Sequence, residues 1–199
     1  VRVTSAGTQR WSIESPSETE STAPVTSGQR VFWSGLDGVV YAADARTGNI
    51  LWRAYTSGPV RFPPEVWQDR VYTGSSDGWI YCFHAHSGEL AWRFRAAPDE
   101  RKIQVHGRLL SNWPVGSGVL VDSQRGQVYA AAGITSYDGT HIYALDAITG
   151  NICWQNNSSG RLVAKDQVTG VSVQGHLLLH EDRLYLAGGP PVFPIITAH

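Results

Sequence analysis

Three residues have the type and the position to bind a ligand. Arg61 stands directly before the segment FPPEVW, and its guanidinium could pair with a carboxylate or another anion. Trp113 stands directly before PVGSG, and its ring could stack on a flat ligand. The neighbouring Asn112 offers a carboxamide that could coordinate calcium or pair with an amide. A structural role stays open for each: a solvated rim arginine, a packing tryptophan and a turn asparagine.

The other reactive residue types lack the spacing that catalysis requires. The carboxylates are scattered in loops and beside glycines, and no pair of them points to acid–base chemistry. The sequence contains neither a GxSxG motif nor a P-loop. Cys82 and Cys153 form no CxxC, and we expect both to be buried free thiols. His84 and His86 are interpreted as a degenerate turn, so no metal site and no catalytic residue is predicted.

Composition and charge narrow the class of protein. The chain has 199 residues, of which 42% are hydrophobic and 17% charged, as expected for a folded protein with a substantial core. The formal net charge is -1 and there is no basic run, which argues against nucleic acid and anionic membranes as partners. No apolar run is long enough to span a bilayer. The chain lacks Met, which favours a processed or excised piece, so a missing signal peptide does not indicate a compartment.

A repeated stretch indicates the fold that positions the candidate residues. YAADARTGNILW (41–52) recurs as YCFHAHSGELAW (81–92) and as YALDAITGNICW (143–154), each running from a Tyr to a Trp. The first two copies are 40 residues apart, and such a period with several short strands is typical of propeller blades. We therefore expect an all-β fold, a β-propeller of four-stranded antiparallel blades.

The elements within each copy follow from its pattern. Residues 31–35 and 71–75 read as apolar strands that end at Asp-Gly, which favours a type I′ hairpin with positive φ at both central residues. Residues 39–43 and 79–83 are nearly continuous apolar strands, as expected when both faces of a sheet are buried. The next turn contains a Gly for a left-handed residue. The closing Trp is expected to fill the gap between adjacent blades.

The third copy departs from the period and predicts where loops stand out. Trp92 and Trp154 are 62 residues apart, largely because of extra residues in the loop 97–118. A second long loop follows at 155–175. Such rim loops on a rigid scaffold often carry function. Five residues of these loops predict a mildly basic rim, with a solvated surface as the alternative: Arg101, Lys102, Arg108, Arg161 and Lys165.

The repeat predicts one propeller region over residues 1–199, with three whole blades and two partial ones. We expect the tail of a preceding blade at 1–22, blades at 23–56 and 57–96, a blade with the insertion at 97–157, and the front half of a further blade at 158–199. These blades are expected to form an arc of a ring of about seven or eight blades, with closure into a ring of about four as the alternative. A homodimer that completes the larger ring is a predicted partner.

The pattern A-x-D-x-x-[ST]-G-x-x-x-W resembles the tryptophan-docking motif of the quinoprotein, or PQQ-like, β-propellers. Ala42, Asp44, Thr47, Gly48 and Trp52 match it, and the third copy matches at the equivalent positions. The second copy keeps the Ser, the Gly and the Trp but lacks the Ala and the Asp. The run SSDGWIYCFHAHSGELAWRFRAAPDERKI further resembles large bacterial PQQ-like repeat proteins without an assigned activity. This resemblance implies a propeller and a periplasmic or otherwise extracytoplasmic location.

The family resemblance implies two different functions. Its PQQ-dependent alcohol dehydrogenases hold the cofactor in the axial funnel between a Trp and a ring formed by two adjacent cysteines, with Ca²⁺ and an Asp base. This chain has no adjacent cysteines. On the dehydrogenase hypothesis, Arg61 would meet a carboxylate of PQQ, Trp113 would stack on the cofactor and Asn112 would bind Ca²⁺.

The second function is that of a non-catalytic scaffold, and we expect it for this chain. Such a binding module would present its rim loops to a protein partner or a small anionic ligand, without a required cofactor. Part of a PQQ- and Ca-dependent quinoprotein dehydrogenase is the alternative. An exposed aromatic patch would favour an interaction face, and a closed pocket with converging charges would favour a cofactor site.

Overall fold

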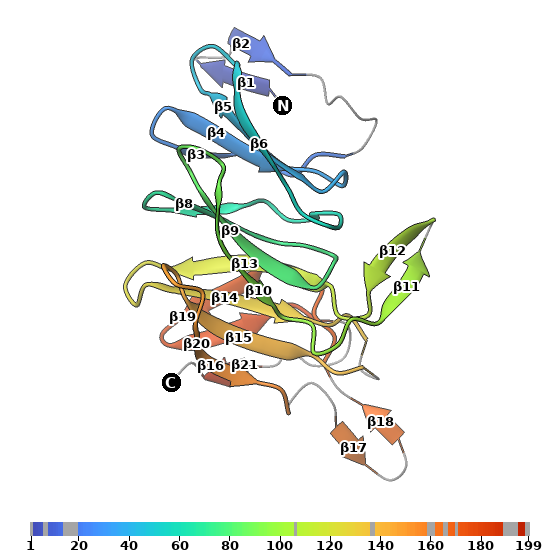
Figure 1. Cartoon of the computed structure of the whole chain (residues 1–199). Helices are drawn as coiled ribbons and strands as arrows, with labels where there is room; N and C mark the ends of the chain where they lie inside the picture. Colours follow the sequence, from blue (N-terminus) through green and yellow to red (C-terminus); the bar gives the residue numbers. More distant parts are fainter. Residues whose placement is uncertain are drawn as a thin grey trace.

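The computed structural model is all-β in the part of the chain that it describes (Figure 1). It describes residues 2–5, 8–13, 20–105, 107–135, 138–158, 162–164, 167–169, 171–188 and 195–197. These residues form strands and turns without a helix, which confirms the predicted fold class.

Three four-stranded antiparallel sheets form the body of the molecule. The first contains β3 (Val25–Ser27), β4 (Arg30–Ser34), β5 (Val39–Asp44) and β6 (Ile50–Tyr55). The second contains β7 (Glu65–Trp67), β8 (Arg70–Gly74), β9 (Trp79–His84) and β10 (Leu90–Arg95). The third contains β13 (Val115–Asp122), β14 (Gln127–Ala132), β15 (His141–Asp146) and β16 (Ile152–Asn156). In each sheet the strands pair in chain order, as in a propeller blade.

Smaller sheets flank these blades. A three-stranded sheet contains β19 (Leu177–His180), β20 (Arg183–Leu186) and β21 (Ile195–Thr197). Three two-stranded hairpins are β1–β2 (Arg2–Ser5, Thr8–Ser12), β11–β12 (Lys102–Val105, Arg108–Ser111) and β17–β18 (Leu162–Ala164, Gln167–Thr169). In Figure 1 the three four-stranded sheets are stacked from top to bottom in chain order, and β11–β12 projects to the side.

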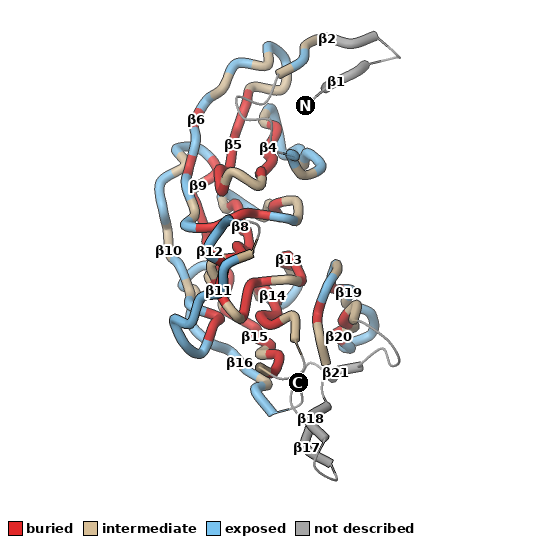
Figure 2. Tube along the Cα trace, turned by 90° about the vertical axis from the view of Figure 1, so that its right-hand side faces the viewer, coloured by how far each residue is buried: buried red, intermediate tan, exposed pale blue. Residues whose placement is uncertain are grey.

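The first strands of the sheets lie along one side of the stack. β3 contacts β7, and β13 contacts both β7 and β19. The second and third strands of each blade are almost continuously buried, whereas β6 alternates between buried and exposed residues. Figure 2 shows this distribution as red inner strands beneath the blue outer strands β6 and β10. The expected burial of the middle strands on both faces is therefore confirmed.

The tryptophans dock each blade onto the next. The Nε1 of Trp52 donates a hydrogen bond to the Ala85 carbonyl at 3.0 Å, and the Nε1 of Trp92 donates to the Ala147 carbonyl at 3.1 Å. A Cβ on Gly88 would stand only 2.6 Å from Cδ2 of Trp52, so the ring lies directly against the turn glycine of the next blade. Trp11 docks in the same way on Gly48. The prediction that the repeated Trp fills the space between blades is confirmed.

The Asp-Gly hairpins differ from the predicted type I′ turn. Gly38 and Gly78 have positive φ (79° and 89°), whereas Asp37 and Asp77 do not. The Gly38 amide donates to the Gly35 carbonyl, and the Asp37 carboxylate accepts from the Val39 amide and the Tyr41 hydroxyl. A type I turn followed by a left-handed glycine fits these bonds, because it lets the Asp side chain cap the start of the next strand. The type I′ prediction was wrong.

The cysteines also correct a prediction. Cys82 is buried, and this burial raises the pKa of its thiol to about 12. Cys153 is exposed, because it lies on β16, the last strand of its sheet, with its side chain facing outward. The expectation that both thiols are buried was therefore wrong for Cys153.

The turn after the third strand is organised by its aspartate. Asp146 Oδ1 accepts hydrogen bonds from the Ile148 amide, the Thr149 amide and the Thr149 hydroxyl. Asp44 makes the same set with Arg46 and Thr47. The hydrogen bonds from the threonine hold the pKa of each carboxyl below its ordinary value. The matched motif positions are therefore a self-contained turn onto which the tryptophan docks.

Asp146→Asn is expected to lower the melting temperature at neutral pH and to weaken the acid-induced loss of stability. A carboxyl with a lowered folded-state pKa stabilises the fold above its unfolded-state pKa of about 4, and this contribution is lost as the pH falls through the folded-state pKa. Circular-dichroism melts from about pH 7 to about pH 3 measure it, with Glu20→Gln at an exposed position as the control. Wild-type melting of Asp146→Asn throughout this range would contradict the role of the turn.

Candidate functional site

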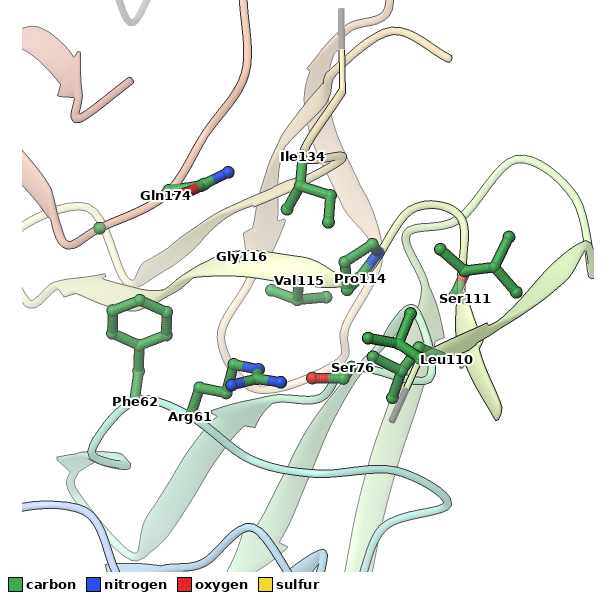
Figure 3. Close-up of a pocket in the computed structure, with 13 residues that line it drawn as sticks. Arg61, Phe62, Ser76, Leu110, Ser111, Pro114, Val115, Gly116, Ile134 and Gln174 are labelled. Atoms are coloured by element: carbon green, nitrogen blue, oxygen red, sulfur yellow. The ribbon is translucent and has the colours of Figure 1, made fainter. Parts of the chain in front are cut away.

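A cavity of about 450 Å³ lies where the inner ends of the blades meet the β11–β12 hairpin. Its walls come from the β6–β7 connection, the β8–β9 turn, the hairpin, the start of β13 and the segments after β14 and before β19. Figure 3 shows side chains from these separate segments converging on it. The lining residues are Arg61, Phe62, Ser76, Ile103, Val105, Leu110, Ser111, Pro114, Val115, Gly116, Ile134, Gln174 and Gly175. We call this cavity the hairpin pocket.

The β11–β12 hairpin forms the apolar wall of the hairpin pocket. Ile103 pairs with Leu110 and Val105 pairs with Arg108 in its register, so Ile103, Val105 and Leu110 share one face. All three line the pocket. The hairpin belongs to the insertion that interrupts the repeat period, and it carries most of the aliphatic surface of this wall.

Several contacts hold the insertion over the neighbouring blades. Arg108 donates a hydrogen bond from its guanidinium to the carbonyl of Leu36, which lies in the β4–β5 turn of the first blade. The Ser111 amide donates to the Ser76 carbonyl at 3.0 Å. The amide of Val115 donates to the Ser75 carbonyl at 3.1 Å. The insertion therefore bridges blades that are far apart in the sequence and closes the pocket from one side.

The three candidate ligand residues are separated by the fold. Arg61 is exposed and lines the hairpin pocket. Trp113 and Asn112 are not among the lining residues. Trp113 is only 3% exposed, donates from Nε1 to the Asp138 carbonyl at 2.7 Å, and has the Arg101 guanidinium 4.8 Å from its ring centroid. A ligand could stack on Trp113 only by displacing such contacts.

Asn112 has a polar side chain next to this packed tryptophan. The backbone amide of Asn112 donates to the Arg101 carbonyl at 3.0 Å, while the side-chain Oδ1 is buried without a hydrogen-bond partner among the described residues. Within the described ranges, no three or more His, Cys, Asp or Glu side chains converge as metal ligands would. His84 lies against Arg70, and His86 against Arg30.

The expected basic rim is partly neutralised by local contacts. Arg101 lies 3.7 Å from the Asp99 carboxylate as well as over Trp113, and Arg108 is bonded to a backbone carbonyl. Arg161 and Lys165 lie outside the described residues. The cation that lines the hairpin pocket therefore comes from Arg61, on the β6–β7 connection rather than on the long loop.

Sequence reasoning missed most of the hairpin pocket. The apolar alternation in KIQV (102–105), followed by a Gly and then by RLL (108–110), was a local signal for a hairpin with one apolar face. Ser76 and Ile134 carried no comparable signal, because each lies in a turn or loop whose neighbours are set only by blade packing.

The comparisons place this geometry among known propellers. The profile of the family described as outer membrane protein assembly factor BamB matches residues 1–190. BamB from Moraxella catarrhalis superposes with a TM-score of 0.65 at 20% identity, over 92% of this chain and 47% of that one. A quinohemoprotein alcohol dehydrogenase from Pseudomonas putida HK5 gives 0.66 at 22% identity, over 84% and 28%. The computationally designed Ika4 protein gives 0.66 at 15% identity, over 97% and 99%.

These matches define the family and the fold. No curated protein sequence matches the chain. The chain spans about half the length of the BamB structure and less than a third of the dehydrogenase. In the described part of the chain, no helical segment has the length and apolarity to cross a membrane. The profile match covers nearly the whole sequence and agrees with the docked tryptophans and the four-stranded blades. The chain therefore belongs to the family of PQQ-like β-propeller proteins described as outer membrane protein assembly factor BamB.

Proposed function

We propose that this chain is a non-catalytic binding module of a β-propeller, which presents the hairpin pocket and its rim to a protein or a small ligand. The observation that carries the proposal is the apolar wall that the insertion hairpin builds over the inner ends of the blades. Fold alone does not choose a function, since both an assembly factor and an alcohol dehydrogenase share this propeller.

The alternative, part of a PQQ- and Ca-dependent dehydrogenase, fits the described residues less well. PQQ is a flat molecule with several carboxylates, and Arg61 is the only cation among the described residues that line the pocket. Trp113 packs its ring on protein groups, and Asn112 lies outside the lining. These residues do not form a matching site for such a polyanion, and we derive no catalytic step from them.

The three residues of the predicted axial site keep different proposed roles. We propose that Arg61 contacts the ligand, because its side chain lines the pocket. Trp113 and Asn112 would instead position the wall, since they directly precede the lining residues Pro114 and Val115. On this proposal, Arg61 is the one residue of the predicted site that contacts the ligand, and Trp113 and Asn112 support the pocket wall from behind.

The family also supports a proposal on location and partners. An assembly factor of the outer membrane works outside the cytoplasm, so we propose a periplasmic or otherwise extracytoplasmic location. A protein partner follows from the same family description. The homodimer that would complete a ring stays a prediction, which light scattering of the purified chain tests directly: the mass of one chain would contradict it.

Ile103→Ser is expected to weaken binding of the neutral apolar reporter dye Nile red by about fivefold, because the substitution removes apolar surface from the pocket wall. Ile103 is 42% exposed, so the substitution should leave the fold intact. Ile148→Ser is the matched control, since Ile148 is 44% exposed and lies outside the pocket. Fluorescence titration measures both. Equal losses in the two variants, or no loss in Ile103→Ser, would contradict the proposed binding surface.

The non-catalytic part of the proposal has a separate test. The purified chain is mixed with PQQ, Ca²⁺ and a primary alcohol, and reduction of an artificial electron acceptor is followed by absorbance. We expect no turnover above a control without protein. Turnover that depends on PQQ and on the chain would establish the dehydrogenase alternative and overturn the proposal.

A further inference from the structure

Two polar groups without partners face the hairpin pocket from its lower side. Ser76 is 4% exposed as a residue and lines the cavity, and its hydroxyl, which is not a fully buried atom, makes no hydrogen bond to another described residue. The Arg61 side chain is exposed and makes no hydrogen bond or ion pair to any described residue. Figure 3 shows the guanidinium and the hydroxyl pointing toward one another below Val115, between Phe62 and Leu110.

The Ser76 hydroxyl and the exposed Arg61 guanidinium are two donors that line the same pocket. A hydroxyl can donate one hydrogen bond, and a guanidinium presents a fork of N–H groups that fits a carboxylate. A ligand carboxylate that accepts from both groups would form charge-assisted hydrogen bonds, which are stronger than neutral ones. One cation balances one negative charge, which points to a monoanion rather than to a polyanion.

Most of the other residues that line the hairpin pocket are apolar, and Ser111 and Gln174 are the polar exceptions. Val115 and Leu110 are 4% and 8% exposed, and both line the cavity together with Ile103 and Ile134. In Figure 3 Ile134 and Val115 lie above the guanidinium, and Leu110 extends the apolar wall away from it. A cavity of about 450 Å³ is within the range of small-ligand pockets. The pocket therefore has one cationic side and a largely apolar wall.

We propose that the hairpin pocket binds an aliphatic monocarboxylate, with the carboxylate between Arg61 and Ser76 and the alkyl chain against the β11–β12 hairpin. This inference rests on the proposed binding function and adds the chemical class of the ligand. The charge fixes the orientation, because the carboxylate meets the only cation among the described lining residues. The alkyl chain then covers Ile103, which is 42% exposed without it.

The test compares decanoate with decanol, which has the same chain length and no charge, by isothermal titration and by displacement of the reporter dye. Wild-type protein is expected to bind decanoate at least about tenfold more tightly than decanol, because charge-assisted hydrogen bonds are stronger than neutral ones. Arg61→Gln is expected to weaken decanoate about tenfold and to leave decanol unchanged. Ser76→Ala should give a smaller loss for decanoate alone.

Controls separate this inference from the proposed function. Arg46→Gln removes an exposed arginine from a turn outside the pocket and should bind decanoate as the wild type does. If decanol and the dye bind but Arg61→Gln leaves decanoate affinity unchanged, the carboxylate site is overturned while the binding module stands. If neither decanoate, decanol nor the dye binds, both proposals are overturned. Tighter binding of the free-acid peptide acetyl-Leu-Leu than of decanoate would overturn the inference in favour of a peptide terminus.

Discussion

Trp52→Ala is expected to lower the free energy of unfolding by about 3–5 kcal/mol, as is usual when a large aromatic side chain is deleted from a core. The ring is 8% exposed and fills the space between the first and second blades. Its Nε1 bonds to the Ala85 carbonyl, and it packs at 5.9 Å between ring centroids against Phe32. The substitution removes all three contributions, and a rigid sheet cannot collapse into the cavity.

Chemical denaturation followed by tryptophan fluorescence and circular dichroism measures this change. Tyr55→Ala is the matched control, because Tyr55 lies on the same strand, β6, and is 69% exposed. It should change the free energy of unfolding by no more than about 0.5 kcal/mol. A loss for Trp52→Ala as small as that of the control would show that docking of the tryptophan does not hold the blades together.

Gly88→Ala is expected to cost about 2–5 kcal/mol of stability, which combines left-handed strain with overpacking. Gly88 has φ of +75°, where an L side chain is strained. The added Cβ would also stand 2.6 Å from Cδ2 of the docked Trp52 ring, and the ring is held by its own hydrogen bond. The tryptophan must therefore move away from the next blade.

A second glycine isolates the docking contribution. Gly28 also has positive φ (+57°), but a Cβ there meets no atom within 4 Å. Gly28→Ala should therefore show the backbone strain alone, about 1–2 kcal/mol. The difference between the two variants in denaturant titrations measures the clash with Trp52. Equal losses in Gly88→Ala and Gly28→Ala would contradict a tight contact between the turn and the ring.

The regular copies of the repeat and the insertion in the third copy have different roles on the proposed function. The first two copies keep their period and build the rigid part of the arc through docked tryptophans. The third copy departs from the period with an insertion, and this insertion supplies the apolar wall of the hairpin pocket. On the proposed function, stability and ligand binding would be carried by different residues, so the stability variants at Trp52 and Gly88 can be separated from the binding variants at Arg61 and Ile103.

The sequence by itself determined the all-β class, the blade and the role of its motif. These features are local or periodic: the turn around Asp44 is closed by residues within three positions of it, and the strands follow from runs of apolar residues. The docking of Trp52 could be predicted because the Trp recurs at a fixed position of the repeat, and the structure shows the contact for Trp11, Trp52 and Trp92. Such features can be predicted without a structure, because their contacts join residues close in the sequence or recur at a fixed period.

Only the tertiary structure decided which residues line the pocket and whether Trp113 and Cys153 are buried or exposed. Arg61, Ser76 and Ile134 come from three connections that meet only when the blades stack. Trp113 is packed, because the Arg101 guanidinium lies over its ring and the Asp138 carbonyl accepts a hydrogen bond from its Nε1. Cys153 is exposed, because it lies on the edge strand of its sheet. Composition and spacing do not record which face of a segment meets a neighbour distant in the chain. That choice is made by packing between blades, where whole sheets must fit together at once.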